Sequence, residues 1–279
     1  MRRNLRRILT VLLVVLGLPV IGVVSCQHKL IYFPRAYPST HEEAWKKVTQ
    51  GKVLCFETSA GQQQAYFFRA RPQTKPARLW LVCGGNGTLA TEWTVFMKHE
   101  APPEDAYLLI DYPGYGANEG SSNPAKMRET LRQALPLAAA ELHWDQKTLQ
   151  QRTRIFGHSL GCAVALMGAQ EFSLNRGVLL APFTSSMDMT KEVVGVDLGF
   201  LVTHRYDNTK ILQSMAKQPD THIQLFHGQS DGIIPASMSC SLHAISPQQF
   251  PLTLCEKSGH NDLQAKQTKA IVRAMNAVQ

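Results

Sequence analysis

The most restrictive feature of the sequence is a regular alternation of two kinds of segment between residue 52 and the C-terminus. Short runs rich in β-branched, aromatic and other apolar residues recur, and a longer stretch with helical composition follows most of them. Near-continuous apolar runs of this length are typical of strands buried on both faces of a sheet. The expected strands are 52–58, 64–70, 78–83, 106–111, 153–158, 177–183, 222–228 and 251–257.

The order of these segments predicts the fold class. Two strands come first with no helix between them, and repeated strand-then-helix units follow. Such units build a mostly parallel sheet with helices on both faces. We therefore expect one α/β domain over residues 51–279, with a mostly parallel eight-stranded sheet. The expected helices are 124–144, 160–172, 236–245 and 262–278.

Composition excludes several classes of protein. The chain is 44% hydrophobic and 18% charged, so it can build a sizeable core and is not disordered throughout. Half of the formal charge of +8 comes from four arginines within the first seven residues, and no long basic run follows, so we expect no nucleic-acid partner. The cysteines form no C-x-x-C pair, and no cluster has metal-ligand spacing. We expect neither a metal nor a cofactor.

Residues 1–26 have the pattern of a targeting segment, with basic residues before an apolar run from Ile8 to Val24. As a helix this run would span about 25 Å, slightly less than a ~30 Å hydrocarbon core. It fits an uncleaved anchor, a cleaved signal peptide, or a lipoprotein signal, because Val23-Val24-Ser25-Cys26 resembles a bacterial lipobox with Cys26 lipidated. We expect membrane attachment, with the body on the extracytoplasmic side. Residues 27–50 are the expected lead-in segment, and residues 27–40, which are rich in aromatic residues and proline, are expected to be extended.

A serine between two glycines marks the turn after the fifth expected strand. The stretch Gly157-His158-Ser159-Leu160-Gly161 joins a strand-like run to a helix-like run. A sharp strand-to-helix elbow holds its central residue in a strained conformation with the side chain exposed, and glycines on either side prevent collisions. Ser159 is therefore a candidate nucleophile. The alternative is an ordinary serine N-cap with glycines for tight packing.

Two later turns supply the partners that a serine nucleophile needs, a base and an acid that orients the base. Asp231 follows the seventh expected strand and His260 follows the eighth, so both lie at the same sheet edge as Ser159. Each could be a plain turn residue, but the order serine, acid, histidine predicts a catalytic triad. Rival acids that fit this order or position less well are Asp111, Asp188 and Asp207.

A tetrahedral intermediate also needs backbone N–H donors for its oxyanion. We expect one at Leu160, at the start of the helix after the elbow, and one at Asn86 in the glycine-rich loop after the third strand. Gly85 and Gly87 are expected to shape that loop and line the substrate site. The alternatives are a plain glycine turn or a phosphate loop, but the stretch lacks the Lys-Ser/Thr ending of a P-loop. Tyr115, in a Pro/Gly turn after the fourth strand, is expected to contact substrate unless that turn is purely structural.

These motifs resemble those of the α/β-hydrolase superfamily across roughly residues 50–279. The stretches LIYFP, GGNG, DYPGYGANEG, GHSLGCAVA, APFTS, HGQSDGIIP and SGHND are similar to those of membrane-anchored hydrolases related to serine aminopeptidases. That group includes lysophospholipases and acyl-protein thioesterases. The resemblance implies triad roles for Ser159, Asp231 and His260. One departure is Gly84-Gly85-Asn86, where the group often has His-Gly-Asn, but the amide donor expected at Asn86 is retained.

The sequence thus predicts a serine hydrolase that cleaves carboxylic esters or thioesters through an acyl-enzyme intermediate, with a small-molecule or lipid acyl substrate. The alternatives are a serine peptidase of the same fold and a catalytically silent binding module. Residues 182–221 would lie over the site, and their apolar stretch VVGVDLGFLV would form a small cap, an acyl pocket or a core helix. The oligomeric state is not predicted.

Overall fold

The computed structural model describes residues 27–278 of the chain. The predicted targeting segment, including Cys26, lies outside the described residues. Within residues 27–278, no helix is both long and apolar enough to cross a membrane.

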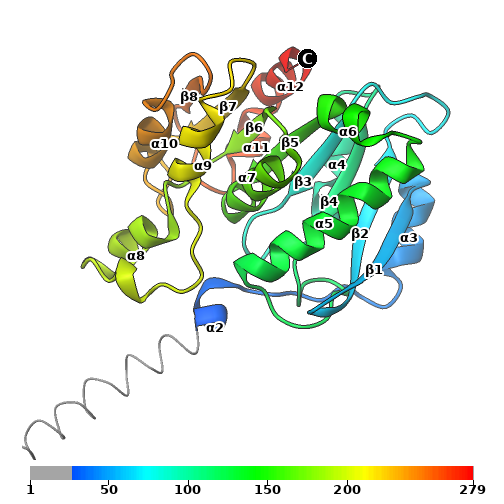
Figure 1. Cartoon of the computed structure of the whole chain (residues 1–279), viewed down its shortest axis with the longest axis horizontal. Coiled ribbons are helices and arrows are strands. Elements are labelled where there is room, and N and C mark those ends of the chain that lie inside the picture. Colours follow the sequence, from blue (N-terminus) through cyan, green and yellow to red (C-terminus); the bar gives the residue numbers. More distant parts are fainter. Residues whose placement is uncertain (1–26, 279) are drawn as a thin grey trace, which may run out of the picture.

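A single eight-stranded sheet forms the centre of the molecule (Figure 1). Its spatial order is β1-β2-β4-β3-β5-β6-β7-β8. Strand β2 pairs in antiparallel fashion with both of its neighbours, and every other pair is parallel. The predicted mostly parallel sheet is confirmed. The strands are β1 Lys52–Thr58, β2 Gly61–Arg69, β3 Leu79–Cys83, β4 Ala106–Ile110, β5 Thr153–His158, β6 Arg176–Leu180, β7 His222–Gly228 and β8 Leu252–Cys255.

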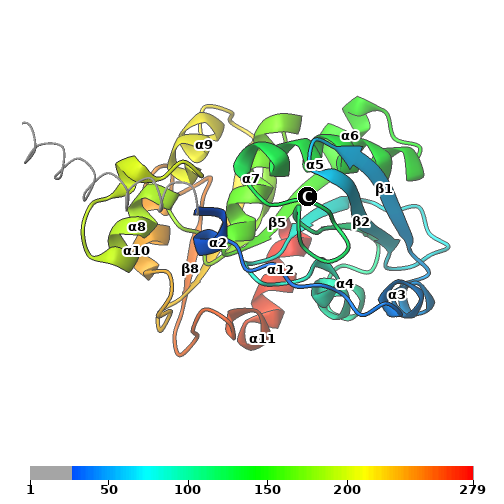
Figure 2. The same ribbon diagram turned by 90° about the horizontal axis from the view of Figure 1, so that it is seen from below.

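Helices cover both faces of this sheet, as expected (Figures 1 and 2). Helices α5 (Pro124–Glu141), α7 (Leu160–Phe172), α9 (Asn208–Met215) and α10 (Ala236–His243) pack into one hydrophobic core. Helices α3 (His41–Thr49), α4 (Thr94–His99) and α12 (Thr268–Ala277) pack into the core on the opposite face. The connections also contain η1 (Ala90–Trp93), α6 (Gln146–Arg152) and α11 (Leu263–Lys266). The helix predicted over 262–278 is therefore divided into α11 and α12.

The lead-in differs from the extended segment that we expected. Residues 27–40 were expected to be extended, but they begin with a short helix, α2 (Gln27–Ile31). Long-range contacts hold α2, because the Gln27 side-chain amide donates to the Leu201 carbonyl and its oxygen accepts from the Thr203 amide at 2.8 Å. A composition rich in aromatic residues and proline gives no sign of such contacts.

Residues 32–37 then run along the edge of the sheet where the parallel strands end. The Phe33 amide donates to Asn86 Oδ1 and to the Tyr115 hydroxyl oxygen, both at 3.0 Å. Ala36 forms an isolated bridge with Gly116. The lead-in therefore contacts the loops after β3 and β4, which carry predicted site residues.

The connection between β6 and α9 stands out from the body. It contains α8 (Ser186–Val194) and η2 (Gly199–Leu201), and α8 has no buried residue. The alternative that VVGVDLGFLV is a core helix is therefore wrong. Figure 1 shows α8 near α2, at the sheet edge that the lead-in follows.

Candidate active site

The turn at Ser159 is a strained elbow between β5 and α7. Ser159 has φ 55° and ψ −122°, a backbone conformation that L-residues rarely adopt. Its amide donates to the Leu180 carbonyl on β6 at 2.9 Å, which fixes the turn against the sheet. Although Ser159 stands at the N-cap position of α7, its side chain makes no capping hydrogen bond. The simple N-cap interpretation is therefore wrong, and the half-buried hydroxyl is left at the strand end.

Both glycines of the elbow are required by steric constraints. A Cβ added at Gly157 would lie 2.6 Å from Cys162 Cα, and one added at Gly161 would lie 2.0 Å from the Cys83 carbonyl oxygen. These distances are far below van der Waals contact, and backbone atoms cannot move aside as a flexible side chain can. The predicted reason for the glycine spacing is confirmed.

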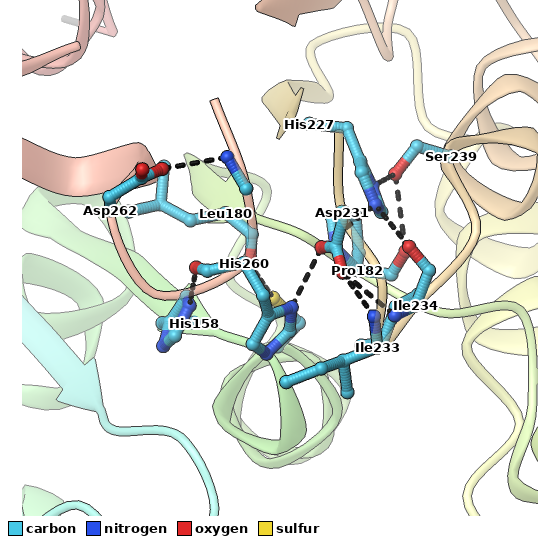
Figure 3. Close-up of polar contacts among 12 residues, drawn as sticks. His158, Leu180, Pro182, His227, Asp231, Ile233, Ile234, Ser239, His260 and Asp262 are labelled. Atoms are coloured by element: carbon cyan, nitrogen blue, oxygen red, sulfur yellow. Dashed lines mark hydrogen bonds and ion pairs between the residues drawn. The ribbon is translucent and has the colours of Figure 1, made fainter. Parts of the chain in front are cut away.

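The predicted base and acid lie in direct contact. His260 Nδ1 is 2.7 Å from Asp231 Oδ2, and both side chains are buried (Figure 3). Asp231 Oδ1 accepts hydrogen bonds from the amides of Ile233 and Ile234 at 2.8 and 2.9 Å. An ionised carboxylate can only accept, so Nδ1 of His260 carries the proton toward Asp231. This tautomer leaves Nε2 of His260 unprotonated and able to accept a proton.

Asp231 is strongly stabilised in its ionised form. Burial alone would raise the pKa of this carboxyl group, but the hydrogen bonds from His227, from His260 and from the two amides outweigh burial. The net effect holds the pKa of Asp231 well below its usual range. Asp231 therefore keeps its negative charge at any pH near neutrality and can stabilise a protonated His260.

A second buried histidine, His227, contacts the same carboxylate and was not among the predicted site residues. His227 Nε2 lies 2.9 Å from the Ile234 carbonyl oxygen and 3.3 Å from Asp231 Oδ2. Its Nδ1 lies 2.6 Å from the Ser239 hydroxyl, which donates to the Pro182 carbonyl at 3.1 Å (Figure 3). The available signal was a histidine near the end of a predicted strand, four residues before the proposed acid. These contacts make His227 a positioning residue for Asp231.

Replacement of His227 by glutamine should therefore lower kcat about 10²-fold while KM changes little, because a small misplacement of the orienting acid is costly. The melting temperature and steady-state kinetics of His227→Gln would be measured together. His222→Gln, at the start of the same strand, is the matched control because His222 contacts none of the triad residues. A loss of kcat that merely follows unfolding, or an equal loss in the control, would contradict a positioning role.

The histidine turn packs directly against the elbow. His158 Nε2 lies 3.2 Å from the His260 carbonyl oxygen, and the two imidazole rings are 5.0 Å apart. Burial, with a smaller contribution from the nearby His260, lowers the pKa of His158 to about 4. A neutral His158 therefore holds the His260 backbone against the elbow. No hydrogen bond among the described residues joins the Ser159 hydroxyl to His260, and such bonds often tighten only when substrate is bound.

The glycine-rich loop after β3 approaches the elbow closely. A Cβ added at Gly85 would lie 2.9 Å from His158 Nδ1 and 3.5 Å from Ser159 Cβ. Gly87 has φ +75°, which favours glycine. Leu160 is the first residue of α7, so its amide lies at the positive end of the helix beside Ser159. The oxyanion roles of the Leu160 and Asn86 amides remain predictions.

The Asn86 side chain anchors this loop to the lead-in. Its Oδ1 accepts from the Phe33 amide and from the Tyr115 hydroxyl at 2.7 Å, and its Nδ2 donates to the Ile31 carbonyl. Tyr115 is fully buried and holds the Asn86 side chain through this hydrogen bond. Direct contact between Tyr115 and a substrate remains a prediction. The structure shows that Tyr115 contacts the loop after β3 through its hydrogen bond to Asn86.

The three rival acids form hydrogen bonds with groups other than His260. Asp111 accepts from the Tyr37 hydroxyl at 2.7 Å and from the Ala90 amide at 2.8 Å, and burial raises its pKa to about 6. Asp188 accepts from two hydroxyl groups at the start of α8, and Asp207 accepts from the amide of Lys210 at the start of α9. Asp231 is the acid that contacts His260.

The predicted triad residues, Ser159, Asp231 and His260, line neither of two large cavities of the body. A cavity of about 500 Å³ is lined by residues such as Lys52, Arg69 and Glu141, and one of about 430 Å³ lies between α5, α7 and α9. Within residues 27–278, no group of three His, Cys, Asp or Glu side chains is placed to hold a metal ion. The side chains of Ser159, His260 and Asp231 supply a hydroxyl, an imidazole and a carboxylate at this edge of the sheet.

Comparison with known families agrees with this geometry. The sequence model of the alpha/beta hydrolase family matches residues 80–232, which include the elbow and Asp231. The chain belongs to the alpha/beta hydrolase family. Two uncharacterised proteins of Mycobacterium tuberculosis are 30% identical to this hydrolase over 245 residues, covering 85% of this chain and 82% of each relative.

Solved structures show the same fold at low sequence identity. An esterase of Pyrococcus furiosus, Pf2001, superposes with a TM-score of 0.66 at 13% identity and covers 89% of this hydrolase and 97% of its own chain. A serine hydrolase without a lid from Xanthomonas campestris gives 0.57 at 13% identity, covering 87% and 97%. An esterase domain from Rhodothermus marinus gives 0.57 at 18% identity, covering 80% and 97%. These similarities establish the fold of the hydrolase, and its chemistry has to be argued from its own residues.

Proposed function

We propose that this hydrolase is a membrane-attached serine esterase or thioesterase that works through an acyl-enzyme intermediate. The observation that carries the proposal is the strained elbow at Ser159, packed against a buried Asp231–His260 pair. A binding module has no physical need for a strained serine at the same sheet edge as a histidine that a buried carboxylate orients.

The proposed reaction follows from the position of each group. Ser159 Oγ attacks the acyl carbonyl carbon while His260 Nε2 removes the hydroxyl proton, and the charge of Asp231 stabilises the resulting imidazolium. The amides of Leu160 and Asn86 donate to the oxyanion. His260 then returns the proton to the leaving alcohol or thiol, and a water molecule activated by the same histidine releases the acyl group from Ser159.

Two observations support the choice of substrate class and location. Several solved structures with this fold are described as esterases, which favours an ester over an amide substrate. Residues 1–26 have the basic and apolar pattern of a membrane anchor or of a signal segment that ends in a lipidated Cys26. The proposal therefore places the body on the extracytoplasmic side of a membrane, close to the acyl groups of lipids.

A panel of substrates that share one acyl chain tests this proposal. A p-nitrophenyl ester, the corresponding thioester and the p-nitroanilide would be compared at matched concentrations, and the series repeated with longer chains. We expect turnover of the ester and the thioester, and a much slower reaction of the anilide. Equal or faster cleavage of the anilide would instead indicate a peptidase, and no turnover of any substrate by folded protein would indicate a binding module.

A further inference from the structure

The segment containing α8 and η2 carries a patch of exposed apolar side chains. We call Val193, Val194, Val196 and Phe200 the α8–η2 patch, and their exposed fractions lie between 52% and 76%. Residues 191–197 are exposed without interruption, and a Cβ added at Gly195 would meet nothing within 4 Å. Single exposed apolar residues are common, but a cluster on a protruding segment is typical of an interaction surface.

The α8–η2 patch lies where the described chain begins. The Gln27 side chain bonds to the Leu201 carbonyl, to the Thr203 amide and to the Thr203 hydroxyl, so residue 27 is fixed at the base of η2. Only Ser25 and Cys26 separate Gln27 from the end of the apolar run at Val24. Figures 1 and 2 both show α2 close to the part of the molecule that carries α8. Any membrane that takes up the apolar run must therefore lie close to the patch.

Two further exposed apolar side chains flank the proposed triad on the same side of the molecule. Phe33 is 59% exposed and is bonded through its amide to Asn86, beside the elbow loop. Ile233 is 54% exposed and is bonded through its amide to Asp231. The triad, the start of the described chain and the α8–η2 patch thus occupy one side of the protein. Other exposed apolar residues, such as Val95 on α4, lie on the helices and strands of the body.

We propose that the α8–η2 patch inserts into the lipid bilayer next to the N-terminal apolar run and turns the triad toward the membrane surface. The proposal rests on the membrane attachment proposed above, and it identifies lipid as the binding partner of the α8–η2 patch. Lys191, Glu192 and Asp197, the charged residues of the exposed stretch 191–197, can stay among the headgroups while the valines and Phe200 enter the acyl boundary. An acyl ester could then reach Ser159 without first crossing water.

Quenching of tryptophan fluorescence by brominated lipids tests this orientation. The full-length chain would be reconstituted in phosphatidylcholine vesicles with bromine on the acyl chains, as wild type, as Phe200→Trp and as Val95→Trp. Val95 is a matched control because it is 70% exposed on α4, which Figures 1 and 2 show well apart from α8. The wild type contains four tryptophans, whose quenching is the background. We expect more quenching than this background for Phe200→Trp and no more than this background for Val95→Trp.

The outcomes separate the patch from the attachment itself. If the chain sediments with vesicles but Phe200→Trp is quenched no more than Val95→Trp, the proposed insertion is wrong although attachment holds. If Phe200→Trp emission instead shifts with protein concentration in plain vesicles, without bromine quenching, the patch binds a second copy and the proposal is overturned. If the chain does not sediment with vesicles at all, both the proposed attachment and the proposed insertion are wrong. The panel of ester, thioester and anilide substrates still tests the proposed hydrolase activity independently.

Hydrolysis rates provide a second readout. Phe200→Ser should lower the rate on a long-chain ester presented in vesicles about tenfold, because a large apolar side chain no longer contributes to membrane contact. The same variant should leave the rate on a soluble short-chain ester unchanged, and Val95→Ser should change neither rate. Equal losses on both substrates would contradict the proposal.

Discussion

Replacing Ser159 with alanine is expected to abolish hydrolysis and leave the fold intact. Loss of the nucleophile from a working triad lowers kcat about 10⁶-fold. The hydroxyl makes no capping hydrogen bond, so its removal should leave the free energy of unfolding almost unchanged. Ester hydrolysis and urea unfolding of the variant would be measured beside the wild type. A residual rate within tenfold of the wild type would show that Ser159 is not the nucleophile.

Ser159→Gly is the companion variant, because it removes the hydroxyl and the backbone strain together. Glycine adopts φ 55° without the steric cost that serine bears at this elbow. We expect an inactive protein that is more stable than Ser159→Ala by about 1 kcal/mol. A gain of stability with loss of activity would show that strain is maintained at this position for catalysis, whereas equal stability of the two variants would contradict the inferred strain.

Replacing Asp231 with asparagine should have the second largest effect, a fall in kcat of about 10⁴-fold. The neutral amide cannot stabilise the imidazolium, and it can favour the wrong tautomer of His260. Asp207→Asn is a matched control, since asparagine is also a good N-cap for α9, and its kcat should stay within twofold of the wild type. Comparable losses in both variants would contradict a special role for Asp231.

The lowered pKa of Asp231 also fixes the sign of its contribution to stability. A carboxyl group whose pKa is depressed by folding stabilises the native state above its unfolded pKa, near 3.9, and this contribution is lost as the pH falls through the folded value. Protonation of Asp231 therefore plays no part in any loss of activity between pH 5 and pH 7.

The sequence predicted the sheet, and the approach of Asp231 to His260, because local signals mark the strands and the turns that follow them. Apolar runs marked the eight strands, and glycine spacing marked an elbow whose steric cause the structure shows at Gly157 and Gly161. Strand order along one edge then brought Asp231 and His260 together. The order of these residues in the chain and the fold class were enough to predict that the two side chains lie close together, because parallel strands end at a common edge of the sheet.

Features that depend on distant contacts were missed. Helix α2 exists through bonds from Gln27 to residues near 201, and composition alone suggested an extended segment. His227 resembled an ordinary strand residue until the fold placed it between Asp231 and Ser239. The hydrogen bond from Tyr115 to Asn86 was not predicted either, because the two residues lie in different loops. In each case the decisive partner lies far away in the fold or on another element.

Labelling with a fluorophosphonate probe tests the central claim most directly, because only an activated serine displaces fluoride from the probe and keeps the phosphonate on Oγ. The full-length wild type, Ser159→Ala and Asp207→Asn would be compared, and the modified peptide identified by mass spectrometry. The account predicts labelling of the wild type and of Asp207→Asn at Ser159, with none in Ser159→Ala. No labelling of folded wild type, or labelling that persists in Ser159→Ala, would contradict it.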